Sequence, residues 1–512
     1  MIQRASIAAF VVAMSLPVLA AERVRPNIVW IVVDDMSPDL SCYRVLPIST
    51  PHIDRLAREG TRFAHAYTTA PVCSPSRSAM ITGMYQTAIG AQHHRSGRGA
   101  LKIHLPDGVR PVPALFQEAG YYTCIGDGLA ADATRPGGKH RQSRGKTDYN
   151  FEWDPAIYDG EDWAGRAEGQ PFFMQVMLGG GKIRDAKRAT AEALEAAGLG
   201  SPVRPEDVKL PPYLPRDPAL LADWAAYLDS VRLTDHHVGK VLARLETEGV
   251  LENTLVIFMT DHGVSHVRAK QFLYDEGTHI PFIVRGPGVA RGAVREDLIE
   301  QIDMAPTSLA AAGIPIPGAM QGRDLFAAGR QPREAVFAAR DRCDETVDRI
   351  RSVRTDRFLY IRNYFPQRPL LQPNAYKDAK PTLQALRRLH AAGDVPPLTE
   401  RLLFSPTRPA EELYLWRDDP WQLANLADDP THGADLEACR ARLDRWMQAM
   451  RDSEGEPEAQ YDSDMAVYVG AGNPEVERNI ATMKRMAAEE REETKVEPGG
   501  RSQKARSGSD GM

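Results

Sequence analysis

The chain contains few cysteines and no long apolar run beyond its first residues. Its five cysteines are Cys42, Cys73, Cys124, Cys343 and Cys439. This set is odd in number and sparse for 512 residues, so it is not a disulfide framework, and at least one thiol has a role other than pairing. No segment after residue 21 has the uninterrupted apolar length of a transmembrane helix. We therefore expect no stable membrane span in the mature chain.

Neither basic nor acidic residues are in large excess. The chain has 63 basic and 69 acidic residues, which gives a net charge of -6. This balance provides no overall attraction to nucleic acid or to an anionic membrane surface. We therefore expect no nucleic-acid partner, although a locally basic substrate pocket is compatible with these numbers. The length suffices for a large core and two or three domains.

The first 21 residues have the layout of a secretory signal peptide. Arg4 is followed by an apolar run from Ile7 to Leu19 and then by the small residues Ala20 and Ala21. A charged start, a short apolar stretch and a small-residue end are typical of a cleaved export signal. The alternative is a membrane anchor, for which the run is short. We expect residues 1–21 to be removed and the protein to be secreted or periplasmic.

Two apolar runs end abruptly at acidic residues. Residues 27–35 read NIVWIVVDD and residues 253–263 read NTLVIFMTDHG, and both are typical of strands buried on two faces of a parallel sheet. In open parallel α/β sheets, ligands bind beyond the carboxyl ends of the strands. Asp34, Asp35, Asp261 and His262 are therefore candidate ligands of one cation. The alternative is that these acids cap the helices that follow.

Cys73 lies between these two runs, in the segment PVCSPSRSAMITG. Pro75 and the small residues predict a turn that leads into a helix at Ser76. Such a helix start would direct backbone N–H groups and the guanidinium of Arg77 toward an anion. The alternative for an isolated cysteine is a buried, inert thiol.

Four motifs together resemble the type I, formylglycine-dependent sulfatases of the alkaline phosphatase superfamily. They occur in family order: Asp34-Asp35, the Cys-x-Pro-Ser-Arg signature at Cys73, Asp261-His262-Gly263, and a segment that opens at Glu412 with Glu-Leu-Tyr and reaches Asp-Pro. The resemblance covers most of the chain. It implies an α/β fold, an alkaline-phosphatase-like α/β/α sandwich with a large mixed, mostly parallel sheet, plus a smaller C-terminal subdomain with an antiparallel sheet.

The resemblance also implies the chemistry of the site. In this family a formylglycine-generating enzyme oxidises the cysteine to 3-oxoalanine (formylglycine), whose hydrate attacks the sulfur atom and later expels sulfate. The implied metal ligands are Asp34, Asp35, the modified Cys73, Asp261 and His262, and Arg77 steadies the hydrate. Calcium is the expected ion. Many sulfatases have Asn at position 262, and imidazole is a softer ligand, so Mn²⁺ or another divalent cation remains an alternative.

Two lysines correspond to family lysines that contact the sulfate. Lys146 follows Gly145 as the nearest equivalent of a Gly-Lys-x-His motif, without the usual His, and Lys270 follows the Asp-His-Gly motif. A solvated basic loop is the alternative for Lys146. The resemblance also leads us to look for a histidine after residues 170–178 that would protonate the leaving oxygen, and none is present there. The candidates to compensate, or to contact substrate, are His93, His94, Lys182, Arg184 and His266.

The expected domains are a sulfatase catalytic domain at residues 22–351, a C-terminal subdomain at 352–450 and a polar, disordered tail at 451–512. Arg342, Asp344, Glu345 and Arg349 precede the subdomain, where they line the substrate mouth or form surface ion pairs. The predicted function is hydrolysis of sulfate esters or sulfamates, on a sulfated carbohydrate. One alternative is a phosphonate monoester or phosphodiester hydrolase with the same nucleophile. The other is a non-catalytic glycan-binding protein, if Cys73 is unmodified.

Overall fold

A computed structural model describes residues 25–130, 145–452, 455–470 and 472–496, with side chains up to residue 489. The predicted signal peptide lies outside the described residues. All five cysteines lie inside them, and none forms a disulfide, which confirms that they are not a disulfide framework. Within the same ranges no helix has the length and apolar character needed to cross a membrane.

The core of the protein is a seven-stranded sheet. Its strands, in spatial order, are β3 (Tyr122–Gly126), β4 (Phe172–Leu178), β1 (Asn27–Val33), β5 (Thr254–Thr260), β6 (His279–Arg285), β2 (Thr61–Tyr67) and β7 (Ala293–Glu300). β6 is antiparallel to its neighbours β5 and β2, whereas the other neighbouring pairs are parallel. The predicted mixed, mostly parallel sheet is confirmed.

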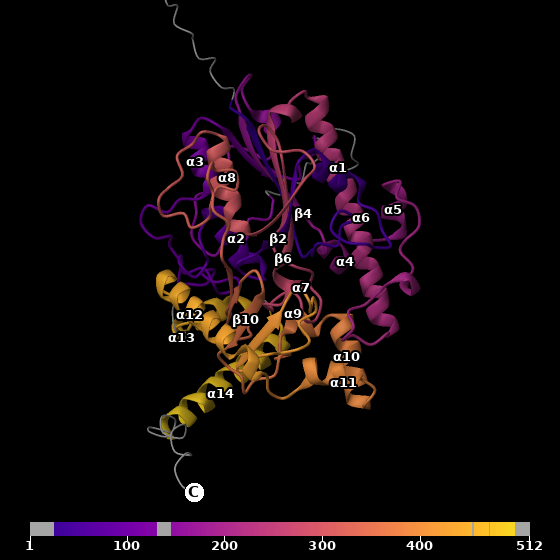
Figure 1. The fold of residues 1–512 in the computed structure, drawn as a ribbon, viewed down its shortest axis with the longest axis vertical. Helices are drawn as coiled ribbons and strands as arrows, with labels where there is room; N and C mark the ends of the chain where they lie inside the picture. Colours follow the sequence, from indigo (N-terminus) through magenta and orange to yellow (C-terminus); the bar gives the residue numbers. More distant parts are fainter. Residues whose placement is uncertain (1–24, 131–144, 453–454, 471, 497–512) are drawn as a thin grey trace, which may run out of the picture.

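Helices cover both faces of this sheet (Figure 1). One face carries α1 (Pro51–Glu59) and α6 (Pro218–Thr247), and the other carries α2 (Cys73–Thr82), α3 (Val112–Glu118) and α8 (Met304–Ala311). Alternate residues of β1 point to opposite faces: Val29 and Ile31 pack in the α1–α6 layer, and Ile28 and Trp30 pack in the α2–α8 layer. Because both faces are covered, every residue of β1 and β5 is buried, which explains their continuous apolar sequences.

A second, smaller sheet is antiparallel throughout. It consists of β11 (Glu411–Leu415), β10 (Phe358–Asn363), β9 (Ile350–Arg354) and β8 (Val336–Arg340). α12 (Gly433–Met450) packs against it through Leu443 and Trp446. The sheet confirms the predicted smaller C-terminal unit, but β8 precedes residue 352, so that position does not separate two structural units. Three α-helices and a π-helix lie between β10 and β11, namely α9 (Ala375–Asp378), α10 (Pro381–Ala392), α11 (Pro397–Thr399) and the π-helix Glu400–Phe404.

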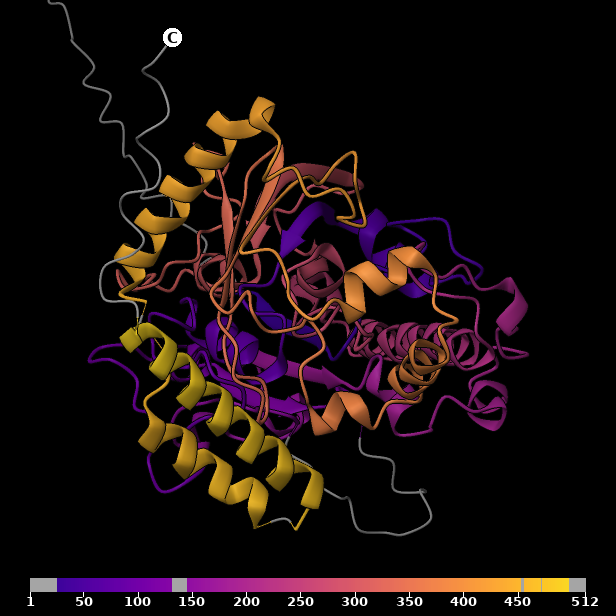
Figure 2. The ribbon, with the colours of Figure 1, turned by 90° about the horizontal axis from the view of Figure 1, so that it is seen from below.

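The prediction of a disordered tail is wrong for most of residues 458–496. This part forms α13 (Glu458–Val469) and α14 (Pro474–Val496), which lie side by side (Figure 2); we call the pair the α13–α14 hairpin. Val467 and Val469 of α13 are exposed, whereas Tyr461 and Met465 on α13 and Val476 and Met483 on α14 are buried. The buried residues are spaced four and seven positions apart, so each helix presents one narrow apolar stripe to the protein.

The remaining short helices lie between these elements. They are α4 (Lys182–Asp185), which begins just after β4, α5 (Ala191–Ala196) and α7 (Asp275–Thr278), which ends where β6 begins. α4 and α5 lie on the α6 side of the sheet (Figure 1).

α1 receives its N-terminal cap from another helix, which gives a prediction about pH. Thr50, at the N-cap position, makes no capping bond, and buried Asp235 of α6 accepts from the N–H groups of His52 (3.4 Å) and Ile53 (2.8 Å). Burial raises the pKa of Asp235 to about 7, although these bonds lower it. The folded state therefore binds this proton more tightly than the unfolded state, and stability falls as the pH rises from about 4 through about 7.

Asp235→Asn retains one acceptor oxygen and removes this titration. We expect the melting temperature of the variant to rise relative to that of the unaltered protein as the pH is raised from 5 to 8. Melting curves of both proteins across this pH range measure the difference. Parallel curves would show that Asp235 does not titrate in this range.

Candidate active site

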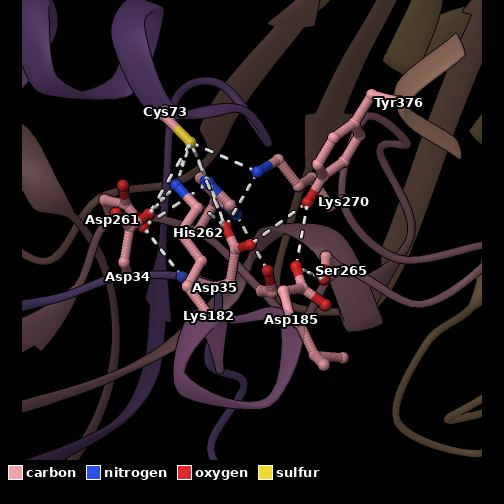
Figure 3. A network of polar contacts seen from close by, with 12 residues as sticks. Asp34, Asp35, Cys73, Lys182, Asp185, Asp261, His262, Ser265, Lys270 and Tyr376 are labelled. Carbon is pink, nitrogen blue, oxygen red and sulfur yellow. Dashed lines mark hydrogen bonds and ion pairs between the residues drawn. The ribbon is translucent and has the colours of Figure 1, made fainter. Parts of the chain in front are cut away.

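Two strand ends and one helix start meet at the carboxyl edge of the large sheet. Asp34 and Asp35 follow β1, Asp261 and His262 follow β5, and Cys73 is the first residue of α2. The Cys73 Sγ atom lies 3.2 Å from His262 Nε2 and 3.6 Å from Asp34 Oδ1 (Figure 3). Ligand-type atoms of Asp34, Cys73, Asp261 and His262 all lie within 4.8 Å of one another. The residues that the sequence suggested as one group are thus brought together, and all of them are buried.

Asp35 adopts a strained backbone conformation at the end of β1. Its φ of 53° lies in the left-handed region, which non-glycine residues rarely occupy. This turn lets its N–H donate to Asp261 Oδ1 over 3.3 Å, while Asp35 Oδ1 lies 4.0 Å from Cys73 Sγ. Strain of this kind persists only where the surroundings over-determine it, and it clusters at functional sites.

The hydrogen bond made by His262 indicates that a cation fits here. Its Nδ1 atom lies 2.8 Å from the carbonyl oxygen of Gly263, so Nδ1 carries the proton, and Nε2 of the neutral ring is an acceptor. This Nε2 lies 3.2 Å from Asp35 Oδ1 and 3.5 Å from Asp261 Oδ1. Acceptors that face one another in a buried site need either a second proton on the ring or a metal ion between them. Three carboxylates and one imidazole are a suitable donor set for a divalent cation.

Four basic side chains surround the same carboxylates. Lys182 Nζ lies 2.9 Å from Asp34 and 3.4 Å from Cys73 Sγ, and Lys270 Nζ lies 2.8 Å from Asp35 and 3.2 Å from Cys73 Sγ. The other two are Lys146, 2.9 Å from Asp34, and Arg77, 2.9 Å from Asp261.

These charges set the protonation of the cluster. Burial opposes ionisation of Asp34, but Lys146, Arg77, Lys182 and Lys270 hold its pKa well below the usual range. The thiol responds in the same way: burial opposes the thiolate, yet the three lysines lower the pKa of Cys73 to about 7. The site therefore stabilises negative charge at position 73, which is a property required of a centre that receives an anionic group.

The glycine run after β4 positions Lys182. A Cβ atom on Gly180 would lie 2.1 Å from the backbone oxygen of Asp34, and Gly180 has a φ of +50°. The N–H of the next residue, Gly181, donates to that same oxygen over 3.0 Å. The chain thus passes directly against the end of β1, which only glycine permits. Residues 179–181 serve this close approach, and α4 then begins with Lys182 beside the thiol.

A pocket of about 260 Å³ opens over Cys73. We call it the Cys73 pocket; its lining consists of Cys73, His94, Arg95, Lys182, Lys270, Asp344, Glu345, Ala375, Tyr376, Tyr468, Asn473 and Val476. Of the candidate substrate residues, His94 and Lys182 line it. Of the four residues proposed for the substrate mouth, Asp344 and Glu345 line it, whereas Arg342 and Arg349 line a neighbouring cavity.

His93, Arg184 and His266 do not line the Cys73 pocket. His93 lines the neighbouring cavity. His266 stacks on Trp224 with ring centroids 3.9 Å apart, and its Nε2 atom lies 3.1 Å from Asp223 and 3.0 Å from the guanidinium of Arg184. These three residues thus lie outside the described lining of the Cys73 pocket, and their contact with substrate stays a prediction.

Four residues that line the pocket come from the C-terminal part of the chain and were not predicted from the sequence. Tyr376 of α9 extends its hydroxyl to within 3.5 Å of Asp35 Oδ2 and 3.4 Å of Asp185 (Figure 3). Its ring centroid lies 5.0 Å from Lys270 Nζ, which is within range of a cation–π interaction. Tyr468, Asn473 and Val476 come from the hairpin region that was expected to be disordered. None of them belongs to a motif, so only the fold reveals them.

The sequence matches known proteins over most of its length. Residues 26–314 match the Sulfatase family, and residues 262–370 match the C-terminal region of N-sulphoglucosamine sulphohydrolase. An ulvan-active sulfatase of Formosa agariphila is 32% identical over 479 residues, covering 85% of this chain and 77% of the relative. The human N-sulphoglucosamine sulphohydrolase is 29% identical over 485 residues, covering 85% of this chain and 92% of the relative.

Solved structures share the fold at lower sequence identity. A protein solved in complex with its substrate D-glucosamine-2-N,6-O-disulfate has a TM-score of 0.57 and 19% identity, covering 84% of this chain and 99% of that one. A phosphonate monoester hydrolase from Silicibacter pomeroyi has a TM-score of 0.53 and 21% identity, covering 84% and 96%. These two likenesses concern the fold alone. From the family match and its relatives, the chain belongs to the sulfatase family of the alkaline phosphatase superfamily and is a sulfuric ester hydrolase.

Proposed function

We propose that the protein removes sulfate from O-sulfated or N-sulfated carbohydrates by using a formylglycine formed from Cys73. The observation that carries this proposal is the position of the Cys73 Sγ atom. It lies at the start of a wholly buried helix, within 3.4 Å of two lysine amines and 3.6 Å of Asp34. An inert core thiol has apolar neighbours, whereas this one is surrounded by charge.

Asp34, Asp35, Asp261 and His262 are the residues that would hold a divalent cation together with the modified residue 73. Calcium fits the three carboxylates, and His262 leaves Mn²⁺ or another divalent ion as the alternative. Formylglycine supplies, when hydrated, one hydroxyl for attack on sulfur and another whose deprotonation releases sulfate, and the cation supplies positive charge beside them.

The basic side chains of this chain bind and orient the sulfuryl group. Lys182 and Lys270 both contact the Cys73 Sγ atom, whose place an oxygen of the formylglycine hydrate would take. Each has a raised pKa despite burial, so each stays charged. Arg77 is fixed by Asp261 and stays beside residue 73. Positive charges that are already in place stabilise the developing negative charge without a cost of reorganisation at the moment of reaction.

Carbohydrate is the substrate class that the comparisons favour. One relative is named for activity on ulvan, another for hydrolysis of N-sulphoglucosamine, and a structural neighbour was solved with a disulfated glucosamine. The disulfated glucosamine carries both a sulfate ester and a sulfamate group. His262 favours the alternative of phosphonate monoester or phosphodiester hydrolysis, because it replaces the amide found in many sulfatases.

The proposed activity requires oxidation of Cys73, and the proposed location requires export. Cys73 is only 2% exposed in the fold, so a formylglycine-generating enzyme would need to act before the chain folds around it. Export through a signal peptide at residues 1–21 would take the protein to the periplasm or outside the cell.

The test compares the release of sulfate and phosphate from matched aryl sulfate, phosphate and phosphonate esters, and from N-sulfated and O-sulfated glucosamine. We expect sulfate release to dominate and to fall about 10³-fold or more in Cys73→Ala, because the nucleophile is lost. The intact mass of the peptide that contains Cys73 reports conversion to the aldehyde, which lowers the mass. Faster phosphate release would support the phosphorus-centred alternative, and a persistent thiol without turnover would indicate a binding protein.

Lys270→Met tests the sulfuryl site, because it removes the ammonium charge and keeps the apolar stem. We expect kcat to fall about 10²- to 10³-fold, as for other preorganised charges at a transition state. Lys209→Met, at an exposed lysine, is the matched control. Circular dichroism melting verifies the fold of both variants, and a near-normal kcat for Lys270→Met would remove this residue from the mechanism.

Gly180→Ala tests the close approach at the end of β1. The added Cβ would clash with the backbone oxygen of Asp34, and we expect displacement of Lys182 to lower kcat/KM about 10²-fold, since an ångström of misplacement has effects of this size. Gly198→Ala is the control for backbone strain, because Gly198 also has a positive φ (+69°) but meets nothing within 4 Å. Equal losses in the two variants would contradict the positional explanation.

A further inference from the structure

The α13–α14 hairpin forms part of the boundary of the Cys73 pocket. Tyr468 lies near the end of α13, Asn473 just precedes α14, and Val476 lies in the first turn of α14. All three line the pocket together with Cys73. The end of the chain is thus folded back against residues of the sulfatase core.

Buried polar contacts hold the hairpin in this place. Asp464 of α13 is 1% exposed and accepts from Ser96 Oγ (2.8 Å), from the N–H of Gly97 (2.9 Å) and from Arg342 (2.7 Å). These donors belong to the sulfatase core, so the core compensates the negative charge of Asp464. A buried carboxylate of this kind is costly to leave unpaired, which makes the docked position specific.

Two further contacts join the hairpin to Glu345, which also lines the pocket. Asn479 of α14 donates to Glu345 Oε1 over 2.8 Å, and the Tyr461 hydroxyl donates to the Glu345 carbonyl oxygen over 2.9 Å. At the pocket itself, the Tyr468 hydroxyl donates to Asp344 Oδ1 over 3.1 Å. The hairpin and residues 344–345 therefore form one continuous surface.

The pocket that results is small and is bounded by many segments. Its described lining comes from residues 94–95, 182, 270, 344–345, 375–376, 468, 473 and 476, together with Cys73. Its volume of about 260 Å³ is below the range of about 300–1,000 Å³ that is common for drug-sized ligands. This space suits one sulfated sugar ring. A chain bound by an internal unit has to leave the site in two directions and therefore needs an open groove.

We infer that the enzyme acts on the terminal residue of a glycan chain and that the α13–α14 hairpin imposes this restriction. The inference rests on the proposed function, since it specifies which sulfates of a carbohydrate reach Cys73. Tyr468 determines the restriction to terminal residues most directly, because it lines the pocket and its hydroxyl joins the hairpin to Asp344. Arg95, Asp344 and Asn473 provide polar groups that bind the hydroxyls of the terminal sugar.

The first experiment compares a sulfated monosaccharide with a linear oligosaccharide that carries sulfate on every repeat and a label at its reducing end. Mass spectrometry after enzymatic digestion locates each lost sulfate. We expect sulfate release from the monosaccharide and from one chain end only. Release from internal units at a similar rate overturns the inference while leaving the proposed function intact. No release from either substrate overturns the proposed function and the inference together.

The second experiment uses Tyr468→Ala. We expect the KM for the monosaccharide to rise about tenfold with little change in kcat, and the ratio of internal to terminal release to rise at least about tenfold, as one lost pocket group commonly changes selectivity by this amount. Val467→Ala, at an exposed position of the same helix, is the matched control. An unchanged ratio in a variant with a normal melting curve overturns the role of the hairpin.

Discussion

The structure depends on the neutralisation of three buried carboxylates at one edge of the large sheet. Asp34, Asp35 and Asp261 are at most 3% exposed, and isolated ionised carboxylates are very unfavourable in such surroundings. The backbone is arranged to bring compensating charge to them: the glycine run allows Lys182 to approach, and α2 brings Arg77 beside Asp261. The charges that stabilise the carboxylates are thus also those that attract an anionic substrate.

The acidic strand ends of the site could be predicted from local sequence, whereas the alkaline-phosphatase-like fold was implied by the family resemblance. A continuously apolar strand that stops at acidic residues is a local signal, and because parallel strands end at one edge of a sheet, two such signals predict one cluster. This reasoning identified Asp34, Asp35, Asp261 and His262. The role of Cys73 followed from the family resemblance, and the helix predicted to begin at Ser76 begins at Cys73. The structure brings the five residues within a few ångströms of one another.

Part of the pocket wall could not be predicted, because Tyr376 and the residues of the α13–α14 hairpin reach the site through long-range packing. Tyr376 lies in a four-residue helix without a motif, and the hairpin has a polar composition that is typical of disorder. Its docking depends on Asp464 meeting Ser96 and Arg342, which lie far away in sequence. Conversely, His266 and Arg184 are close to motif residues in sequence but are held by Asp223 and Trp224. Proximity in sequence does not tell which direction a side chain faces.

The two sets of residues, those around Cys73 and those of the pocket boundary, have different roles. The charged groups around Cys73 come from residues 34–270, whereas much of the pocket boundary comes from residues 344–345, 375–376, 468, 473 and 476. The boundary contacts the charged cluster mainly through Tyr376, whose hydroxyl reaches Asp35. Changes in α9 or in the hairpin can therefore alter which sugar enters while the charges around Cys73 stay in place. A common sulfur chemistry can be combined in this way with different glycan specificities, because the carboxylates constrain the core but not the elements that cover it.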